Sequence, residues 1–236
     1  MTARADRLLR ARLNAPRDPV LVTRRLALTL PNPARVPELV QLLRDPRIAR
    51  WTLNIPYPYR ASDARTWLRR APARRRAGTD LILHLVRRSD RALVGGLGLH
   101  HFDARHARAE VGYWLGKPFR RQGYTTEAIR ALCEYAFRRL GLHRLEAKVL
   151  SGNAASVGVL RAAGFRREGR LRQSVVKQGR FRDEIVFSRL AGDRPRTGRT
   201  RRGRPLSGSA TARASAARAR RPRAPRRKAT PSKRSP

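Results

Sequence analysis

The chain has 236 residues, with 56 lysines and arginines against 16 aspartates and glutamates, so its formal net charge is +40. Its length favours one domain with extensions, and its 40% of hydrophobic residues is typical of a globular protein. The single cysteine, Cys133, excludes a disulfide framework and a cysteine-based zinc site, and the five histidines show no metal-binding spacing. No apolar run reaches membrane-spanning length. We therefore expect a soluble, cytoplasmic protein that uses no metal.

The basic residues are concentrated in the C-terminal part of the chain but are not confined to it. Residues 194–236 contain 16 basic residues and no acidic ones, which leaves 24 of the 40 net charges in residues 1–193. A segment of this composition cannot bury a core and is predicted to be disordered. The charge favours phosphate-rich partners such as RNA or DNA. A GC-rich coding sequence would produce the same arginine and alanine bias, so both explanations stay open.

These composition changes predict three parts: a basic, disordered extension over residues 1–18, a folded domain over residues 19–192, and a disordered basic tail over residues 193–236. Within the first part, Leu8, Leu9 and Leu13 could form a brief amphipathic helix that ends before Pro16.

Strand and helix signals alternate in the first half of the predicted domain. A strand is expected over Val20–Leu30, and Asn32 caps a helix that has Pro33 in its first turn and runs to about Arg44. The proline-aromatic loop Trp51–Tyr59 follows, and after it a second helix is expected. Ser62 should cap this helix, and Asp63 should complement its dipole. The helix is expected to end or kink near Pro72, and Gly78 closes the segment.

The second half continues the alternation. Two strands joined by a turn at Ser89-Asp90 are expected over Leu81–Val86 and Leu93–Leu99, and a third strand over Ala109–Leu115. A helix should then run from Thr125 or Thr126 to Gly141, followed by a strand over Arg144–Leu150 and a helix over Asn153–Ala163. A closing hairpin is expected from the strands Phe165–Leu171 and Phe181–Leu190. Together they predict an α/β fold in which a mixed sheet carries helices.

The most informative segment joins the strand Ala109–Leu115 to the following helix. The loop Arg120–Thr125 opens that helix, whose first backbone N–H groups lack partners and whose dipole favours anions. Gly123 permits close approach of the backbone, and Arg120 and Arg121 add charged donors for phosphate oxygens. The loop is therefore predicted to bind a diphosphate. Neither the Walker pattern nor the dinucleotide-binding glycine pattern fits the chain.

Seven motifs resemble, in order, those of the GNAT superfamily of N-acetyltransferases, and of its branch that acetylates the N-termini of ribosomal proteins. The phosphate loop reads Arg120-x-x-Gly123-x-Thr125, with Thr125 in place of the usual small residue, and continues as Thr126-Glu127-Ala128. The other six are Thr23–Leu26, Ile55–Tyr59, Gly95–Gly98, Glu110–Leu115, Asn153-x-x-Ser156 and Ala163–Phe165. The resemblance covers about residues 20–190.

The resemblance implies a mixed, mostly antiparallel sheet with a splayed pair of strands, helices on both faces, and acetyl-CoA as cosubstrate. It implies that the pantetheine arm lies along Tyr113, Trp114 and Leu115, and that the pyrophosphate lies on Arg120, Arg121, Gln122, Gly123, Tyr124 and Thr125. It also places Asn153 and Ser156 at the cofactor, with Asn153 counted among the catalytic residues as well. The alternative role of both residues is helix capping.

Glu110 is the preferred general base, acting through water, because it begins the strand beside the expected acetyl site and has apolar neighbours. The alternatives are that His100 or His101 is the base, or that Glu110 is only a solvent-facing or salt-bridged carboxylate of the strand. Many relatives place a tyrosine four residues before the glycine of the Gly-Phe pair, to protonate the leaving thiolate; that position is Leu160 here. We therefore expect no dedicated general acid at that position.

The acceptor is predicted to be a primary amine, most plausibly a protein N-terminus such as that of a ribosomal protein. A small amine (an antibiotic or a polyamine) and a non-specific nucleic-acid-associated role for the basic tail remain alternatives. Trp51, Tyr57, Tyr59 and Asp183-Glu184 are candidates for the acceptor side or for packing and ion pairing. Both a monomer and a dimer are compatible with the sequence.

Overall fold

The computed structural model describes residues 2–15 and 18–193, so the tail predicted over 194–236 lies outside the described residues. Within the described part, eight strands form one sheet in the order β1-β2-β3-β4-β5-β6-β8-β7. The strands are β1 (Leu21–Val22), β2 (Leu26–Thr29), β3 (Leu81–Arg87), β4 (Leu93–Asp103), β5 (Arg108–Leu115), β6 (Arg144–Leu150), β7 (Arg166–Lys177) and β8 (Arg180–Leu190). The helices are α1 (Thr2–Asn14), η1 (Pro33–Arg35), α2 (Val36–Leu43), α3 (Pro46–Trp51), α4 (Ala61–Ala77), η2 (Lys117–Phe119), α5 (Tyr124–Tyr135), the π-helical turn η3 (Ala136–Leu140) and α6 (Ala154–Ala162).

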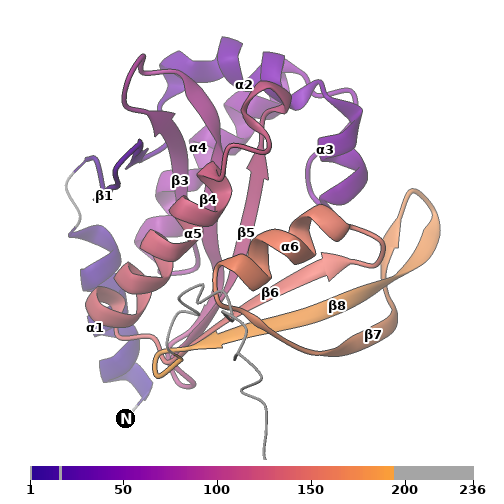
Figure 1. The fold of residues 1–236 in the computed structure, drawn as a ribbon. Helices are drawn as coiled ribbons and strands as arrows, with labels where there is room; N and C mark the ends of the chain where they lie inside the picture. The colour runs from indigo at the N-terminus through magenta and orange to yellow at the C-terminus, as the bar shows by residue number, and fades with distance from the viewer. Residues whose placement is uncertain (1, 16–17, 194–236) are drawn as a thin grey trace, which may run out of the picture. The chain divides into compact units, whose positions relative to one another are not determined.

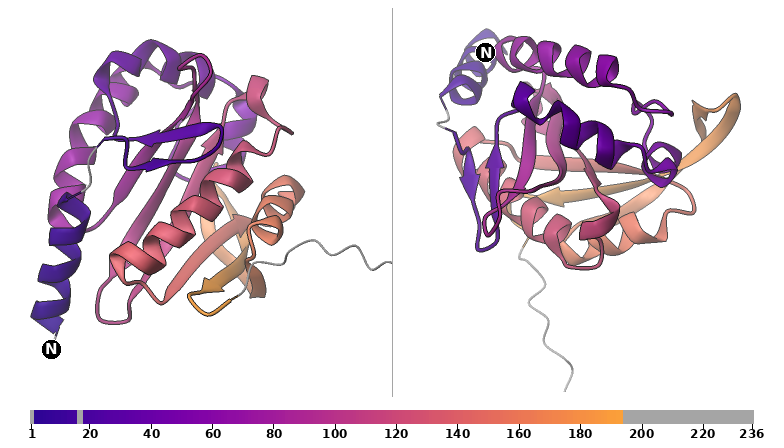
Figure 2. Two further views of the ribbon diagram at one scale, coloured as in Figure 1. Left: turned by 60° about the vertical axis from the view of Figure 1, so that its left-hand side comes forward. Right: turned by 90° about the horizontal axis from the view of Figure 1, so that it is seen from above.

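Helices cover both faces of the sheet, as Figures 1 and 2 show: α2 and α4 on one face, α5 and α6 on the other. Each face has its own buried cluster. The cluster on the α5 side includes Leu97, Ile129 and Phe187. The other cluster includes Leu39 of α2, Leu68 of α4 and Leu93 of the sheet. The predicted fold, a mostly antiparallel mixed sheet between two helical layers, is confirmed.

The one parallel pair of strands in the described sheet is β5 with β6. Its register extends only from Arg108↔Arg144 to Glu110↔Glu146, although β5 continues to Leu115 and β6 to Leu150. The two strands therefore diverge after Glu110, which is the splay that the resemblance implied. The edge of β5 that faces β6 is unpaired from Val111 onward.

The N-terminal segment differs from the expectation of disorder over residues 1–18. Residues 2–14 form α1, in which Leu9 and Leu13 are buried whereas Leu8 is 49% exposed. Arg12 Nη1 donates a hydrogen bond of 3.0 Å to the carbonyl oxygen of Leu140, beyond α5. Disorder was the wrong prediction here because the short amphipathic helix gains a tertiary partner, which supplies most of the stability of such helices. The leucine pattern had indicated this helix.

Two further elements depart from the sequence-based boundaries. The strand expected over Val20–Leu30 is the hairpin β1–β2, whose turn is closed by a 2.8 Å bond from Thr23 N to Leu26 O. Helix α4 continues through Pro72 to Ala77, and Gly78 ends it with a φ of 79°. Ser62 does not cap it: Arg60 is the capping residue, and Asp63 Oδ2 accepts a 2.8 Å bond from the Arg60 N–H.

A buried histidine makes stability depend on pH. His84, on β3, is fully buried and stacks on Trp67 with ring centroids 5.8 Å apart. Neither of its ring nitrogens has a hydrogen-bond partner among the described residues. Burial, together with the charge of Arg35, lowers the pKa of His84 to about 4, because a buried imidazolium has lost its hydration.

The unfolded chain binds a proton at His84 near pH 6.5, and the folded protein does so only near pH 4. The free energy of unfolding should therefore fall as pH drops from about 6.5 to 4, by up to ~3 kcal/mol from this residue, with the full stability present above pH 6.5. Urea unfolding at pH 7 and pH 4.5 measures it. His84→Leu should remove most of the difference, and His143→Gln, at an exposed position, should not. Equal acid sensitivity in all three proteins would contradict the assignment.

Candidate active site

The splay between β5 and β6 opens into a cavity of about 710 Å³. Side chains from both faces of β5 line it: Glu110 and Trp114 from the α4 face, Val111 and Tyr113 from the α5 face. Because successive residues of a strand point to opposite faces, a cavity that reaches both sets must pass through the sheet. The gap can therefore admit an extended chain from one face while a second reactant enters from the other.

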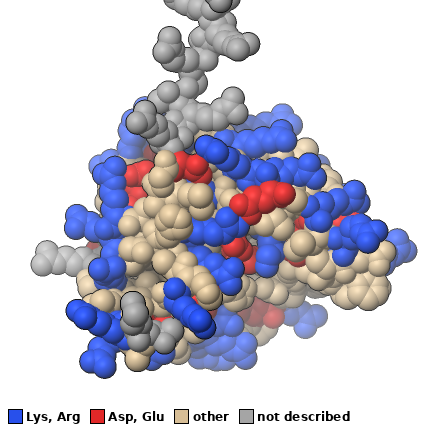
Figure 3. Space-filling model, turned by 90° about the horizontal axis from the view of Figure 1, so that it is seen from below, with Lys and Arg blue, Asp and Glu red and all other residues tan. Residues whose placement is uncertain are grey.

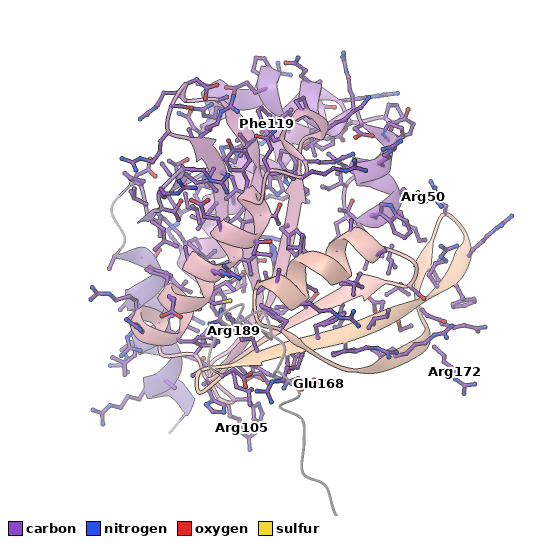
Figure 4. The ribbon with its side chains drawn as sticks, viewed as in Figure 1. Arg50, Arg105, Phe119, Glu168, Arg172 and Arg189 are labelled. Carbon is purple, nitrogen blue, oxygen red and sulfur yellow. The ribbon has the colours of Figure 1, made fainter. Side chains whose placement is uncertain are left out.

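Strand β5, which forms one side of this gap, leads through η2 to the N-terminus of α5. Its capping position is Gly123, with a φ of 78°, and no side chain of the described residues caps the helix. Arg121, two residues earlier, also has a positive φ, of 63°. The first helical N–H that is bonded within the turn belongs to Glu127, which donates to Gly123 O at 3.1 Å. The preceding amides are available to an anion, as the sequence predicted. Phe119, labelled in Figure 4, lies in the loop that leads to this turn.

A contact that the sequence reading missed holds this turn in place. Glu127 accepts bonds from Thr23 Oγ1 at 2.7 Å, from the Arg25 backbone N–H at 2.9 Å and from Arg25 Nε at 2.6 Å. Partial burial alone would raise the pKa of Glu127, but the bonds from Thr23 and Arg25 outweigh it and lower the pKa. The guanidinium of Arg25 also lies 4.5 Å from the centre of the Tyr124 ring. The Thr23–Leu26 and Thr126–Ala128 motifs, far apart in the chain, are thus two halves of one clamp.

The clamp borders a hollow of about 590 Å³ on the outer side of the turn, lined by Thr23, Arg24, Arg25, Gly123, Thr126, Glu127 and Arg130. Arg24 is exposed there. The hollow combines the helix N-terminus with arginine side chains, an arrangement suited to phosphate groups.

The predicted loop residues divide into two groups. Arg120 Nη2 lies 2.7 Å from Asp45 Oδ2, and Gln122 Nε2 donates to Pro118 O at 3.0 Å, so both side chains bind protein groups rather than facing the hollow. Tyr124 and Thr125 are buried, so what they offer an anion is their backbone N–H. The unusual Thr125 is accommodated because its side chain points into the domain.

Glu110 lies in the cavity wall at the point where β5 and β6 separate. Its Oε2 is 3.2 Å from Lys148 Nζ on β6 and 3.6 Å from His101 Nδ1. His101 has a φ of 51°, at the irregularity in the β4–β5 pairing, and its side chain is 80% exposed. The alternative of a salt-bridged Glu110 is met in this structure, with Lys148 as its partner.

His100 is directly opposite Glu110 in the antiparallel β4–β5 register, so both side chains project to the α4 face. Its Nδ1 is 2.6 Å from Oδ1 of Asp80, a buried carboxylate that also accepts a 2.8 Å bond from Thr79 Oγ1. Burial pushes the pKa of Asp80 up, but the bonds from His100 and Thr79 more than compensate, so the pKa is lowered and Asp80 stays ionised. His100 and Asp80 both line the cavity.

The three residues expected along the pantetheine arm sit on the divergent part of β5. Tyr113 bridges the gap: its hydroxyl and Ser156 Oγ are 2.6 Å apart, and burial raises the pKa of Tyr113 to about 12. Trp114 packs over Gly96 on the opposite face, and Leu115 joins the α5-side core. The backbone edge of Tyr113–Leu115, which is not paired with β6, faces the space between the strands.

Asn153 and Ser156 line the cavity, and Asn153 also performs the capping that was the alternative role of both residues. Asn153 Oδ1 accepts a 3.1 Å bond from the Ser156 N–H at the start of α6. Leu160, one turn further along α6, is fully buried and lines the same cavity, so the position of the family's tyrosine is apolar here.

The α4-side mouth of the cavity has aromatic and acidic residues. Trp51, Tyr59 and Glu184 line it, whereas Tyr57 is exposed. Glu184 is buried and accepts a 3.0 Å bond from Ser174 Oγ, while its neighbour Asp183 pairs with Arg170. Lys177 Nζ donates to Thr52 O at 2.6 Å, which ties the β7–β8 hairpin to the Trp51–Tyr59 loop.

Cys133 is buried in α5, and burial raises the pKa of its thiol to about 11, so it packs as an apolar residue and is not a nucleophile at neutral pH. In the described ranges, no three His, Cys, Asp or Glu side chains are grouped to hold a metal ion. No helix among these residues is long and apolar enough to cross a membrane.

Comparisons with known proteins agree with this geometry. Residues 25–166 match the family model described as Acetyltransferase (GNAT) domain. The uncharacterized N-acetyltransferase p20 of Bacillus licheniformis is 31% identical over 72% of the chain and 95% of its own length. The ribosomal-protein-serine acetyltransferase of Escherichia coli is 28% identical over 42% of the chain and 55% of its own length.

Among solved structures, the ribosomal L7/L12 alpha-N-protein acetyltransferase RimL in complex with coenzyme A superposes with a TM-score of 0.67 at 23% identity, covering 72% of this chain and 96% of that one. At that identity the likeness concerns the fold. The family match over more than half of the chain, and the full-length similarity to p20, decide the assignment: the chain belongs to the GNAT family and is an N-acetyltransferase.

Proposed function

We propose that this N-acetyltransferase transfers the acetyl group of acetyl-CoA to a primary amine, namely the N-terminal amine of a protein such as a ribosomal protein. One observation carries the proposal: β5, whose residues line the cavity at the β5–β6 splay, leads through η2 directly into the uncapped N-terminus of α5. The anion site, the gap for an extended arm and the acidic mouth thus follow one another in the order that acetyl-CoA and an amine require.

The donor would be held mainly by backbone groups. The pyrophosphate binds the N–H groups of Gly123, Tyr124 and Thr125, with Arg121 and Arg24 as exposed cations nearby. The pantetheine amides pair with the edge of β5 from Tyr113 to Leu115, which lacks a strand partner there. A backbone N–H of this segment polarises the thioester carbonyl. Asn153 and Ser156 contact the arm from α6.

The acceptor side suits a cation with a short extended chain behind it. The carboxylates of Asp63, Asp80, Glu110 and Glu184 line the cavity together with the cations of Arg70, Arg74 and Lys148. Carboxylates thus outnumber cations there, in a domain whose surface is mainly basic, as the Lys and Arg side chains in Figure 3 illustrate for one face. The surrounding charge repels polyamines at long range, which favours a protein N-terminus over that alternative. The relatives named for acetylating ribosomal proteins point the same way.

The basic tail remains a separate proposal, because it lies outside the described residues. Non-specific attraction to RNA would concentrate the enzyme at ribosomes, where new N-termini emerge, and it would weaken steeply with salt. This role is compatible with catalysis.

The anion site can be tested by Gly123→Glu. The new side chain puts a carboxylate at the helix N-terminus and strains a left-handed residue, so binding of acetyl-CoA measured by calorimetry should weaken at least 100-fold. Gly158→Glu is the matched control, because it adds the same charge at an exposed glycine of α6 with open space around it. Unchanged affinity in Gly123→Glu would exclude this loop as the phosphate site.

The acceptor can be identified by measuring acetyl-CoA turnover with N-terminal peptides, ribosomal proteins, polyamines and aminoglycosides. We expect protein or peptide N-termini to give the highest kcat/KM, and peptides with a blocked N-terminus to give no product even when they contain lysine. Faster turnover of a polyamine or an aminoglycoside would replace the protein acceptor by the small-amine alternative.

Glu110 is proposed to accept a proton through water. Glu110→Gln keeps the shape but cannot take the proton, so kcat should fall 10²–10⁴-fold with acetyl-CoA affinity unchanged. In the pH–rate profile, the acid limb that belongs to the carboxylate should disappear. A loss of acetyl-CoA affinity with kcat retained would instead make Glu110 a structural residue of the splay.

A further inference from the structure

The reaction removes two protons from one nitrogen at two separate stages, and two bases would give each stage its own proton acceptor. An ammonium loses a proton before it can attack the thioester carbon, and it loses a second when the C–N bond has formed. The C–S bond breaks and the thiolate takes one proton from water, so that one proton is released overall. A second base beside Glu110 could therefore accept one of the two protons that leave the amine.

His100 has the geometry of an oriented base. The carboxylate of Asp80 is ionised and buried, and it can only accept a hydrogen bond, so the 2.6 Å contact requires a proton on Nδ1. In the neutral ring Nε2 then carries the lone pair. This is the arrangement by which a carboxylate fixes the tautomer of a histidine that acts as a general base.

The unprotonated nitrogen lies inside the cavity. His100 Nε2 lies over two glycines of the sheet. A Cβ atom built on Gly98 would be 2.8 Å from Nε2, and one built on Gly112 would be 3.1 Å from it. Both glycines line the cavity, and neither has a side chain that would fill the space in front of the ring. The side chain of His100 is 30% exposed, so a water molecule or an amine can reach it.

The charged groups around His100 come from four directions. Glu110 faces it from β5, Lys148 lies behind Glu110 on β6, Arg74 of α4 is 3.8 Å from Asp80, and the His101 ring centre is 6.4 Å away. The carboxylates of Asp80 and Glu110 are thus the nearest anionic groups to the imidazole, with the cations of Arg74 and Lys148 beyond them.

We propose that His100 is a second catalytic base of the site, which takes one of the two amine protons at Nε2 and releases it to water, and that Asp80 is its positioning residue. Glu110 takes the other proton through water. The inference rests on the proposed function, because it needs an amine in the cavity, but the protonation pattern of His100 can be measured without turnover.

The chain contains a matched control pair. His106 Nδ1 is 2.8 Å from Asp103 Oδ2, in the same type of contact, but Asp103 ends β4, His106 lies in the turn that follows, and neither residue lines the cavity. Substitutions of His106 and Asp103 therefore change a histidine–aspartate contact at a distance from the reacting groups.

With the acceptor found in the screen, His100→Gln and Asp80→Asn should each lower kcat 10²-fold or more with acetyl-CoA affinity within 3-fold of the wild type. His106→Gln and Asp103→Asn should stay within 3-fold in kcat. Added imidazole should restore at least a tenth of the lost rate to His100→Ala and nothing to Glu110→Gln. Normal kcat in His100→Gln, or no rescue of a folded His100→Ala, would overturn the proposal.

Nitrogen-15 NMR of the full-length protein supplies the test that is independent of activity. His100 should show the Nδ1–H tautomer in the wild type and a mixture of tautomers in Asp80→Asn, while His106→Gln leaves the signal unchanged. An Nε2–H tautomer in the wild type would refute the role of Asp80 even in an active enzyme. A wild type that has the predicted tautomer but acetylates no amine would instead refute the proposed function.

Discussion

Strands β5 and β6 are hydrogen-bonded for only three residue pairs, and the site depends on their separation after Glu110. Both strands are secured on their outer edges, β5 by β4 and β6 by β8, so the sheet survives the local loss of pairing. Where β5 and β6 are not paired, their backbone N–H and C=O groups have no partner in the neighbouring strand, which is a state that a buried strand edge normally avoids. These groups can bind an extended ligand without any specific side chain. This explains why Tyr113 and Trp114 can point to opposite faces and still belong to one binding surface.

The phosphate end is held by a different kind of interaction. The turn before α5 has left-handed residues at Arg121 and Gly123, and one carboxylate, Glu127, fixes it to the β1–β2 turn through Thr23 and Arg25. The contact spans about a hundred residues of sequence. It lets the helix N-terminus stay uncapped, because the rigidity comes from the base of the turn and leaves its amides available.

The arginine-rich composition makes the cavity chemically distinct. Most carboxylates of the described domain are paired with arginine, among them Glu38, Asp45, Asp90 and Glu168. Within the described residues, Asp63, Glu110 and Glu184 form no ion pair with an arginine side chain, and all three line the cavity. A bidentate arginine would bind such a carboxylate more firmly than lysine, histidine or serine does. These three groups are therefore the ones left to interact with a cationic substrate.

The sequence by itself determined the family, the order of the elements and the location of the phosphate turn, because glycines, caps and hydrophobic periods are local signals. The strand Arg144–Leu150 and the capping of α6 by Asn153 were predicted to the residue. The tertiary structure decided what depends on contacts between distant segments. It folded residues 2–14 against α4, made a hairpin of Val20–Leu30, and turned Arg120 toward Asp45. It also brought Asp80 to His100. The spacing of the two residues in the sequence does not reveal this contact, because the register of the strands determines which side chains meet across a sheet, and the sequence specifies that register only indirectly.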